Sequence, residues 1–557
     1  MNPLSSRPRK GRLGSTKSND GCITCKIRKV KCDELRPACR RCLGTGRKCD
    51  GYGRNVDSHA SRPAAAATSS GNLRRLISTT AHNHAEPEEL RCFEFFMEKV
   101  VPNCTRMVDG AFWHQIIPQL SRSDPVIWYA VNSLACLIRH PQFSPTWTLP
   151  GRKILQPAVT DEHRRALRWY NQSIAKLQER ISNENVSSTT TTITFVSCIL
   201  YICIECVHDD PVEAAALYRR AVAMIGPVSD HHQRGHSSTT RREVTLEETV
   251  RALLRHMAIS QGLPVKRSAA TAAADAGGRP VVAVDGPERH YQFSTLQDAR
   301  DELYVLMSEA HEFIVHVGEI KIRLTKKGWK PSPDLVSWQS CIEANLSKWL
   351  SALRHFVSSN PDIVSQQDDI ERFALLNVGF SHYYIWVATS LNMDETVFDH
   401  FITTFQAMIE HARHAAATRN SGCGRPVFVF ETRFIPSLFF IACKCRDPVV
   451  RRQAVSLLES GPLIENTFKA EPMAKVAKRC IGIEEAGSEG GLFHLQAHKT
   501  EVPPEGHRIT WNKLIEMPDA HHGRVDQYLM FGRWQQQQQQ QQQVGGEWIS
   551  STHIVKI

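Results

Sequence analysis

Residues 22–49 read CITCKIRKVKCDELRPACRRCLGTGRKC, and this stretch decides how the N-terminal part of the chain folds. Its cysteines follow the pattern C-x2-C-x6-C-x6-C-x2-C-x6-C, in which the unit C-x2-C-x6-C occurs twice with an offset of 17 residues. A C-x2-C pair brings two sulfurs to one metal ion from a single turn of the chain, and Zn²⁺ prefers four soft ligands in a tetrahedron. The spacing therefore predicts a metal-binding domain built around zinc.

The number of cysteines indicates how the zinc ions are shared. Two separate tetrahedral zinc sites need eight thiolates, whereas six are enough when two of the thiolates bridge both ions. The repeat makes the first cysteine of each half, Cys22 and Cys39, the natural bridge. Such a cluster carries a charge of −2, because six thiolates surround two divalent ions. One ion then takes Cys22, Cys25, Cys32 and Cys39, and the other takes Cys22, Cys39, Cys42 and Cys49.

Three other interpretations of the cysteines stay open at this point: a disulfide knot, a metal-storage patch, and a single zinc site with two spare thiols. The N-terminus MNPLSSRPRK lacks the apolar segment of a secretory signal peptide, so we expect a cytosolic or nuclear chain with reduced thiols. Storage patches usually lack interleaved apolar residues such as Ile27, Val30 and Leu43. We therefore favour the cluster of two zinc ions.

The positive charge of the chain lies beside this stretch. The 557 residues carry a net charge of +11, and residues 1–54, which hold 15 Lys and Arg against 4 Asp and Glu, account for all of it. The remaining residues hold 53 charges of each sign. A basic end on a neutral body indicates a domain that binds a polyanion.

With this cysteine spacing and the loop residue Pro37, residues 22–49 resemble the fungal Zn2Cys6 binuclear-cluster DNA-binding domain. The resemblance implies two Zn²⁺ per cluster, bridged as counted above. It also implies double-stranded DNA as the partner and the nucleus as the location. In this family the first short helix enters the major groove and reads a CGG-type half-site, so the same is expected here.

The residues between the cysteines fall into groups according to the family's pattern. Lys29 and Arg28 match the positions that read base edges, and lysine donating to guanine O6 and N7 is a common specific contact. Ile27 and Val30, three residues apart, are expected to pack inward on the metal core. The other basic residues are expected to contact phosphates and position the domain: Lys26, Lys31, Arg40, Arg41, Arg47 and Lys48.

The rest of the chain predicts a mainly α protein in distinct segments. We expect a basic disordered arm over residues 1–21 and a flexible linker, rich in Gly, Pro, Ala and Ser, over residues 50–86. Residues 87–534 are expected to form a large all-α regulatory domain with disordered insertions at about 228–242 and 264–288. Residues 535–557 are interpreted as a polyglutamine tail.

The helical periodicity is clearest in residues 161–182. Apolar residues recur there with spacings of 3, 4, 3 and 4, which places them on one face of a helix: Leu167, Tyr170, Ile174, Leu177 and Ile181. We expect further helices at about 195–207, 211–225, 246–258, 296–324, 334–356, 371–393, 397–417 and 448–458. Residues 428–445 fit either a helix or a strand, and the apolar stretch 193–207 is too short to span a bilayer.

Three further groups of Cys and His are interpreted as structural or incidental: Cys203, Cys206 and His208; Cys443 and Cys445; and His231, His232 and His236. The first two groups lie in apolar segments and predict buried thiols, whereas the third lies in a polar loop. The sequence contains no phosphate-binding loop, nucleophile elbow or zinc-protease motif. We therefore predict no catalytic residues and no enzymatic activity.

The sequence as a whole predicts a nuclear, sequence-specific transcription factor acting on genes of RNA polymerase II, and some relatives control biosynthetic gene clusters. Two alternatives are a nucleic-acid or chromatin adaptor without sequence preference, and an enzyme in the helical body that a zinc module targets. Residues 51–86 lack the leucine heptads through which many family members dimerise. A homodimer or coactivator contacts through the helical body, and a monomer on a single half-site, stay open as alternatives. No membrane contact is expected.

Overall fold

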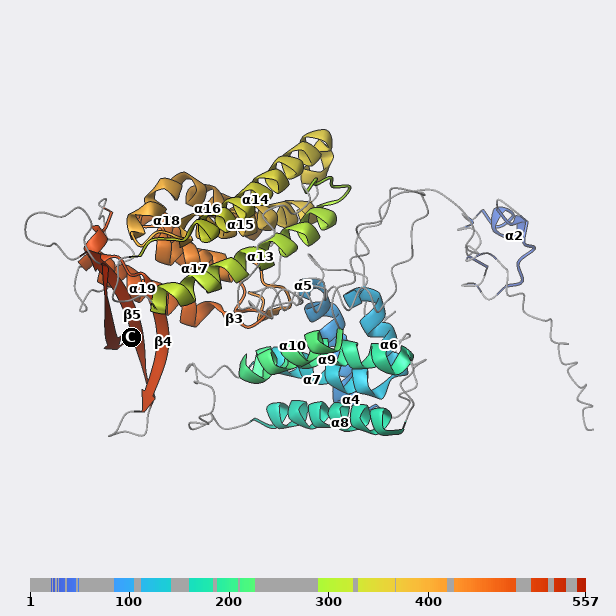
Figure 1. Cartoon of the computed structure of the whole chain (residues 1–557). Coiled ribbons are helices and arrows are strands. Elements are labelled where there is room, and N and C mark those ends of the chain that lie inside the picture. Colours follow the sequence, from blue (N-terminus) through green and yellow to red (C-terminus); the bar gives the residue numbers. More distant parts are fainter. Residues whose placement is uncertain are drawn as a thin grey trace, which may run out of the picture. The chain divides into compact units, whose positions relative to one another are not determined.

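The computed structural model of the chain describes residues 22, 24–25, 28, 30–35, 38–46, 49, 85–104, 112–141, 160–183, 188–208, 211–225, 289–323, 329–365, 367–417, 425–486, 502–518, 525–536 and 548–556. The chain divides into two compact units, Met1–Gly71 and Asn72–Ile557 (Figure 1). The first unit contains the cysteine-rich stretch, and the second contains most of the helices and two small sheets. The prediction of a mainly α chain is therefore confirmed.

The second unit begins with helices that pack around one apolar core. Asp124 starts the central helix of this group, because its carboxylate accepts a hydrogen bond from the N–H of Val126 at 2.9 Å. Pro125 occupies the first helical position, where its missing N–H has no partner to lose. The elements are α4 (Pro87–Phe95), η1 (Phe96–Val100), α5 (Val101–Cys104), η2 (Phe112–Ile116), α6 (Ile117–Ser123), α7 (Pro125–Arg139), α8 (Asp161–Asn183), α9 (Ser188–His208) and α10 (Pro211–Ile225).

Helix α8 confirms the helix predicted over 161–182 but buries a slightly different face. Its buried residues are Ala166, Trp169, Ser173 and Leu177, whereas Ile181 is 52% exposed. Ser173 replaces an apolar residue in the interface because its hydroxyl bonds to the carbonyl of Val126 at 2.6 Å, and the hydroxyl of Tyr201 lies 2.8 Å away. A satisfied hydroxyl is tolerated in a core, so the buried face includes Ser173 as well as Ala166 and Trp169, none of which belongs to the predicted apolar stripe.

The apolar stretch 193–207 was expected to be too short to span a bilayer, but it is part of the longer helix α9. Residues Thr189–His208 form a helix that is long and apolar enough to cross a membrane by length and composition, and 78% of its apolar window is buried inside the protein. Its N-terminal threonines extend the helix, and the hydroxyl of Thr194 donates to the carbonyl of Thr190 at 2.8 Å. Inside this fold α9 is a buried helix of the first core and packs against α7 and α10.

A second group of helices forms a separate core around Phe313, Leu346 and Trp349. The indole N–H of Trp349 donates to the carbonyl of Ala299 at 2.8 Å, which joins two of these helices. The elements of this core are α13 (Leu296–Arg323), α14 (Pro333–Ser359), η5 (Pro361–Ser365) and α15 (Gln367–Ser390). The elements η6 (Glu395–Phe401) and α16 (Ile402–Ala417) follow, and their buried apolar residues belong to a further core that also contains Phe434 and Ile441. The helices predicted at 296–324, 334–356, 371–393 and 397–417 are confirmed, and the one predicted at 246–258 lies outside the described residues.

Residues 428–445 contain both a strand and a helix, because Pro436 stands in the first turn of α17 rather than in its interior. The elements from here to residue 486 are β1 (Phe428–Val429), α17 (Ile435–Lys444), α18 (Pro448–Ser460), β2 (Ile464–Glu465), β3 (Phe468–Lys469) and α19 (Ala470–Ala486). Strands β1 and β2 pair in parallel, and β2 and β3 pair antiparallel. Helix α18 confirms the helix predicted at 448–458.

The small sheet β1–β3 inserts into the core of the first helices. Phe428, Phe430 and Ile464 belong to that core, and the ring of Phe430 lies 4.9 Å from the ring of Trp113. The hydroxyl of Tyr218 in α10 donates to Asn466 Oδ1 at 2.8 Å. The first helices therefore complete their core with residues more than 200 positions later in the chain.

A C-terminal antiparallel sheet departs from the predicted all-α body and polyglutamine tail. Its strands are β4 (Trp511–Pro518), β5 (Val525–Gln536) and β6 (Trp548–Lys556), in the order β4-β5-β6, and η7 (Glu505–His507) precedes them. Leu529 and Phe531 of β5 pack on Val476 and Ile483 of α19. Only the last residues of β5 belong to the glutamine run, and β6 follows the run, so 535–557 is not solely low-complexity sequence. The division into domains otherwise stays a prediction, because the proposed arm, linker and insertions lie outside the described residues.

Candidate metal centre and nucleic-acid interface

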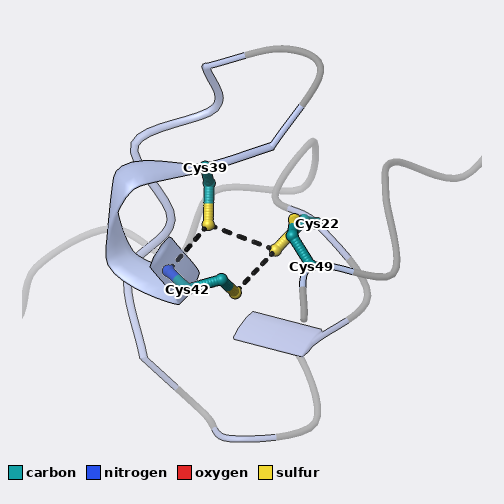
Figure 2. A group of neighbouring side chains, drawn as sticks. All are labelled: Cys22, Cys39, Cys42 and Cys49. Carbon is teal, nitrogen blue, oxygen red and sulfur yellow. Dashed lines mark hydrogen bonds between the residues drawn. The ribbon is translucent and has the colours of Figure 1, made fainter. Parts of the chain in front are cut away.

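The six cysteines of the first unit form two overlapping groups of four sulfurs. One group contains Cys22, Cys25, Cys32 and Cys39, and in each group the sulfur atoms all lie within 4.8 Å of one another. Figure 2 shows the other group, Cys22, Cys39, Cys42 and Cys49. The two groups share Cys22 and Cys39, which are the two cysteines that the repeat predicts as bridges. The two sets of zinc ligands predicted from the spacing are therefore confirmed as neighbours in space.

The distances between the sulfurs fit tetrahedral zinc. Four sulfurs at about 2.3 Å from a central Zn²⁺ lie about 3.8 Å from one another. The Sγ atoms of Cys22 and Cys39 are 3.6 Å apart, and those of Cys22 and Cys42 are 3.8 Å apart. The Sγ atoms of Cys25 and Cys39, which share the other group, are also 3.6 Å apart. These side chains therefore already stand where the ligands of a two-zinc cluster need to be.

The same geometry argues against the alternatives. A disulfide requires an S–S distance near 2.05 Å, and none of the cysteines in the described part of the chain forms one. A single zinc site with two spare thiols has no need for two complete groups of four, yet both groups are present. The disulfide knot and the single-zinc site are thus both poorer fits than the cluster.

Short turns of backbone hold the sulfurs in place. The N–H of Cys25 donates to Cys22 Sγ at 3.4 Å, and the N–H of Cys42 donates to Cys39 Sγ at 3.3 Å. Each C-x2-C pair therefore makes the same turn, and in the second half Cys39 caps the short helix α2 (Arg40–Leu43). Cys32 Sγ accepts from the N–H of Cys22 at 3.3 Å. Donors of this kind orient metal ligands and offset the negative charge of a thiolate cluster.

Burial raises the pKa of the Cys22, Cys25 and Cys39 thiols in the absence of metal. Desolvation raises the pKa of Cys22 to about 12 and raises the pKa of Cys39 further above its ordinary value. Zinc binds thiolates, so it has to displace the thiol protons, and its affinity falls as the pH falls. Cys49 is half-buried, whereas the other five ligands are buried.

The structure places four of the eight predicted DNA-contacting residues. Lys31, Arg40 and Arg41 are exposed, as phosphate contacts require. Arg28 is half-buried, and its Nη1 atom lies 3.3 Å from the hydroxyl oxygen of Thr45. The others lie outside the described residues: Lys26, Lys29, Arg47 and Lys48.

The expectation that Val30 packs inward is wrong, since its side chain is 38% exposed. Leu43 is 61% exposed as well, and Ile27 lies outside the described residues. The cysteines themselves form the buried cluster of this unit, with no apolar side chain among its described buried members. A unit this small is stabilised by metal ligands in place of an apolar core, which leaves its aliphatic residues at the surface.

Two positions that the sequence did not single out connect the halves of the site. Asp33 Oδ2 accepts from the N–H of Arg40 at 3.0 Å, which ties the loop after Cys32 to the start of α2. Thr45 closes the end of α2, where its hydroxyl donates to the carbonyl of Arg41 at 2.9 Å and contacts Arg28. Asp and Thr side chains often bond to nearby backbone groups, and this general tendency was the only signal for both positions in the sequence.

The cysteine groups of the body are buried thiols, as predicted. Cys203 and Cys206 are buried in α9, and Cys206 Sγ lies 3.7 Å from Asn466 Oδ1. Cys443 and Cys445 are also buried. The histidines of the predicted polar loop, His231, His232 and His236, lie outside the described residues.

Comparison with known proteins identifies two segments of the chain. The family model of the fungal Zn(2)-Cys(6) binuclear cluster domain matches residues 20–58, and that of the fungal specific transcription factor domain matches residues 91–256. Over 30 residues, 5% of either chain, this protein is 70% identical to the aspercryptin biosynthesis cluster-specific transcription regulator atnN of Emericella nidulans. Over 133 residues, 24% of this chain and 35% of the relative, it is 32% identical to the Zn(2)-C6 fungal-type transcription factor afumD of Aspergillus fumigatus.

A third relative, an uncharacterized transcriptional regulatory protein of Schizosaccharomyces pombe, is 26% identical over 145 residues, which cover 23% of this chain and 26% of that protein. The chain thus matches about a third or less of the length of each of these curated relatives. No solved structure matches the chain.

Proposed function

Because the chain belongs to the fungal Zn(2)-Cys(6) transcription regulators, we propose that it is a sequence-specific factor for genes transcribed by RNA polymerase II. The observation that carries this proposal is the pair of four-sulfur groups sharing Cys22 and Cys39, with basic side chains around them. In this proposal the protein acts in the nucleus, binds double-stranded DNA and catalyses no reaction.

The proposed mechanism follows from the rigidity of the cluster. When bound, two Zn²⁺ ions cross-link the chain and supply the folding energy that an apolar core supplies elsewhere. Lys29 and Arg28 then contact guanine in a CGG-type half-site. The contact between Arg28 and Thr45 supports this role, because it fixes the guanidinium relative to α2. Contacts with phosphates come from Lys26, Lys31, Arg40, Arg41, Arg47 and Lys48.

The name of one relative narrows the proposed targets. The Emericella nidulans protein is described as a regulator specific to one biosynthesis cluster. We extend this role to the present chain, which then controls the genes of a single biosynthetic pathway. Its oligomeric state decides whether the target contains one half-site or two, and sedimentation of the protein with each kind of duplex measures that directly.

A binding assay with the purified full chain tests the proposal. The affinity of the protein is measured by fluorescence anisotropy for two duplexes. One contains a CGG half-site, and in the other, the exchanged duplex, these three base pairs are replaced by different ones. We expect the exchange to weaken binding about a hundredfold or more, because each wrong base pair costs roughly 1–3 kcal/mol. Equal binding to both duplexes, with only the steep salt dependence of phosphate contacts, would instead identify an adaptor without sequence preference.

A further inference from the structure

The helices of the second core enclose a cavity outside both segments that the family models match. Its lining residues come from α13, α15 and residues 432–437, where α17 begins. The cavity measures about 90 Å³, counted as the volume open to the centre of a water molecule. One water needs roughly 10–15 Å³ by this measure, so the space suits a small organic molecule.

The cavity wall combines apolar side chains with guanidinium groups, each of which also pairs with a carboxylate. Leu303, Met307 and Leu376 are among its apolar members. Three of the sixteen lining residues are arginines, Arg300, Arg372 and Arg433, and none of the sixteen is acidic. A cavity of this composition favours a ligand with an apolar body and an anionic group.

Carboxylates that do not line the cavity hold these arginines in place. Arg433 pairs with Glu371 at 3.0 Å, Arg372 with Asp369 at 2.8 Å, and Arg300 with Asp301 at 3.0 Å. Arg300 and Arg433 are also buried. Since the guanidinium groups are oriented before any ligand arrives, little side-chain freedom remains to be lost on binding.

Further polar groups reach the cavity without adding charge. The hydroxyl of Thr432 is buried and has no hydrogen-bond partner among the residues that the structure describes. His382 Nδ1 lies 3.1 Å from Ser437 Oγ, and burial lowers the pKa of His382 to about 3, which keeps its ring neutral. A buried hydroxyl without a partner needs an explanation, and a bound acceptor group supplies one.

Gly379 keeps the cavity open in the middle of α15. Glycine is among the least favourable residues in a helix interior, so its presence there requires a reason. A Cβ atom at this position would lie 3.9 Å from Leu303 Cδ2 and 3.9 Å from Met307 Sδ, both in ordinary contact. Alanine would therefore fit, whereas a longer side chain would extend among residues that line the cavity.

We propose that this cavity binds a small organic acid, with its apolar part between α13 and α15 and its carboxylate at the arginines. Arginine pairs with carboxylates through two parallel hydrogen bonds, which gives both affinity and orientation. The proposal concerns the second unit alone and goes beyond DNA recognition.

Titration calorimetry on the purified full chain tests this proposal with defined compounds. The acids are 1-naphthylacetate and octanoate, and their uncharged counterparts are 1-naphthylacetamide and octanamide. We expect at least one acid to bind, and its amide to bind at least tenfold more weakly. Absence of binding by both acids, or equal binding of an acid and its amide, overturns the proposal.

Variants then locate the site. Gly379→Leu should abolish binding of the acid, whereas Gly379→Ala should retain it within about twofold. Arg372→Met should weaken binding about tenfold. Arg413→Met serves as its control, because Arg413 also pairs with a carboxylate three residues earlier on its helix, Glu410, but does not line the cavity. If Gly379→Leu fails to fold, the two arginine variants decide. Binding that survives both Gly379→Leu and Arg372→Met contradicts the proposal. The titration involves neither zinc nor DNA, so its outcome is independent of the function proposed above.

Discussion

At the scale of single residues, Cys39 differs from Cys49 in the number of sulfur groups to which each belongs. Cys39 belongs to both groups, and Cys49 belongs to one. We expect Cys39→Ala to lose both zinc ions, because each tetrahedron loses a ligand, whereas Cys49→Ala should keep about one ion per chain. The zinc-to-protein ratio of the purified full-length variants, measured by elemental analysis, checks this. A ratio of two in Cys39→Ala would falsify the shared-ligand geometry.

A second residue-scale prediction separates base contacts from phosphate contacts. Lys29→Ala should reduce the preference for the CGG duplex over the exchanged duplex about tenfold, because a bidentate base contact contributes roughly 1–3 kcal/mol of discrimination. Arg40→Ala, at an exposed position, should weaken binding to both duplexes alike and lower the salt slope by about one. Anisotropy titrations at two salt concentrations measure both quantities. Equal losses for both duplexes in Lys29→Ala would remove Lys29 from base readout.

Residue spacing predicted the metal ligands because zinc restricts its ligands by number and geometry. The same reasoning failed for Val30, since an inward aliphatic residue presumes an apolar core that this unit does not have. It also missed Thr45, whose role depends on Arg28 reaching across 17 positions of the chain. Contacts of that kind depend on the folded path of the backbone, which no local pattern contains.

At the scale of elements, Glu484 of α19 connects helices to the C-terminal sheet. Its carboxylate accepts from Arg446 Nη2 at 3.0 Å and from Arg451 Nη2 at 2.6 Å. It also accepts from the N–H of Ile509 at 2.7 Å, two residues before β4 begins. Burial alone would raise the pKa of Glu484, but the two arginines hold it at about 2.

These contacts predict an acid-sensitive element. A depressed pKa stabilises the fold fully above the ordinary value of 4.5, and this contribution is lost as the pH falls towards 2. Glu484→Gln should lower the free energy of unfolding by about 3 kcal/mol at neutral pH, because it takes the carboxylate partner from buried Arg451 and leaves buried Arg446 with Glu395 alone. Denaturant unfolding at pH 7 and pH 3 measures both effects.

Glu471→Gln is the matched control on the same helix. Glu471 pairs with Lys475 in an exposed pair at 3.0 Å, and such pairs contribute little to stability. We expect a change below about 0.5 kcal/mol at either pH. If Glu484→Gln behaved like this control, the buried network would have no measurable effect on stability.

Periodicity predicted the helices well and the strands poorly. An apolar face repeated over several turns is a strong signal, and α8, α10, α13 and α14 lie close to their predicted bounds. Strand β5 has the sequence VDQYLMFGRWQQ, in which Tyr528 to Phe531 are consecutive apolar residues without alternation. Its pairing with β4 and β6 depends on partners elsewhere in the chain, so its sequence alone did not reveal it.

At the scale of the whole molecule, the segment that matches the fungal specific transcription factor domain does not contain its complete core. That segment ends at residue 256, whereas Phe428, Phe430 and Ile464 belong to the core of its helices. The match in sequence and the folding unit therefore have different boundaries.

Phe430→Ala in the full chain tests this arrangement. Removing a buried phenylalanine should cost about 3–5 kcal/mol and lower the denaturant midpoint of the helices around Trp113. Val449→Ala is the control, since Val449 is 63% exposed and its truncation should change stability by less than about 0.5 kcal/mol.

A fragment covering residues 85–260 should correspondingly bind hydrophobic dyes that the full chain does not bind. A soluble fragment without dye binding would show that its helices need no later residues.

The position of the glutamine run between β5 and β6 has a consequence for natural variation. Nine glutamines occupy positions 535–543, and the first two pair with Ile549 and Trp548 across the sheet. Additional glutamines would lengthen only the connection between two strands whose register is set by the residues from Tyr528 to Gln536. The entropic penalty of a longer connection grows with the logarithm of its length, about 0.6 kcal/mol per doubling. Alleles that differ in repeat number should therefore encode proteins of nearly equal stability, and this stretch of the gene is free to drift in length.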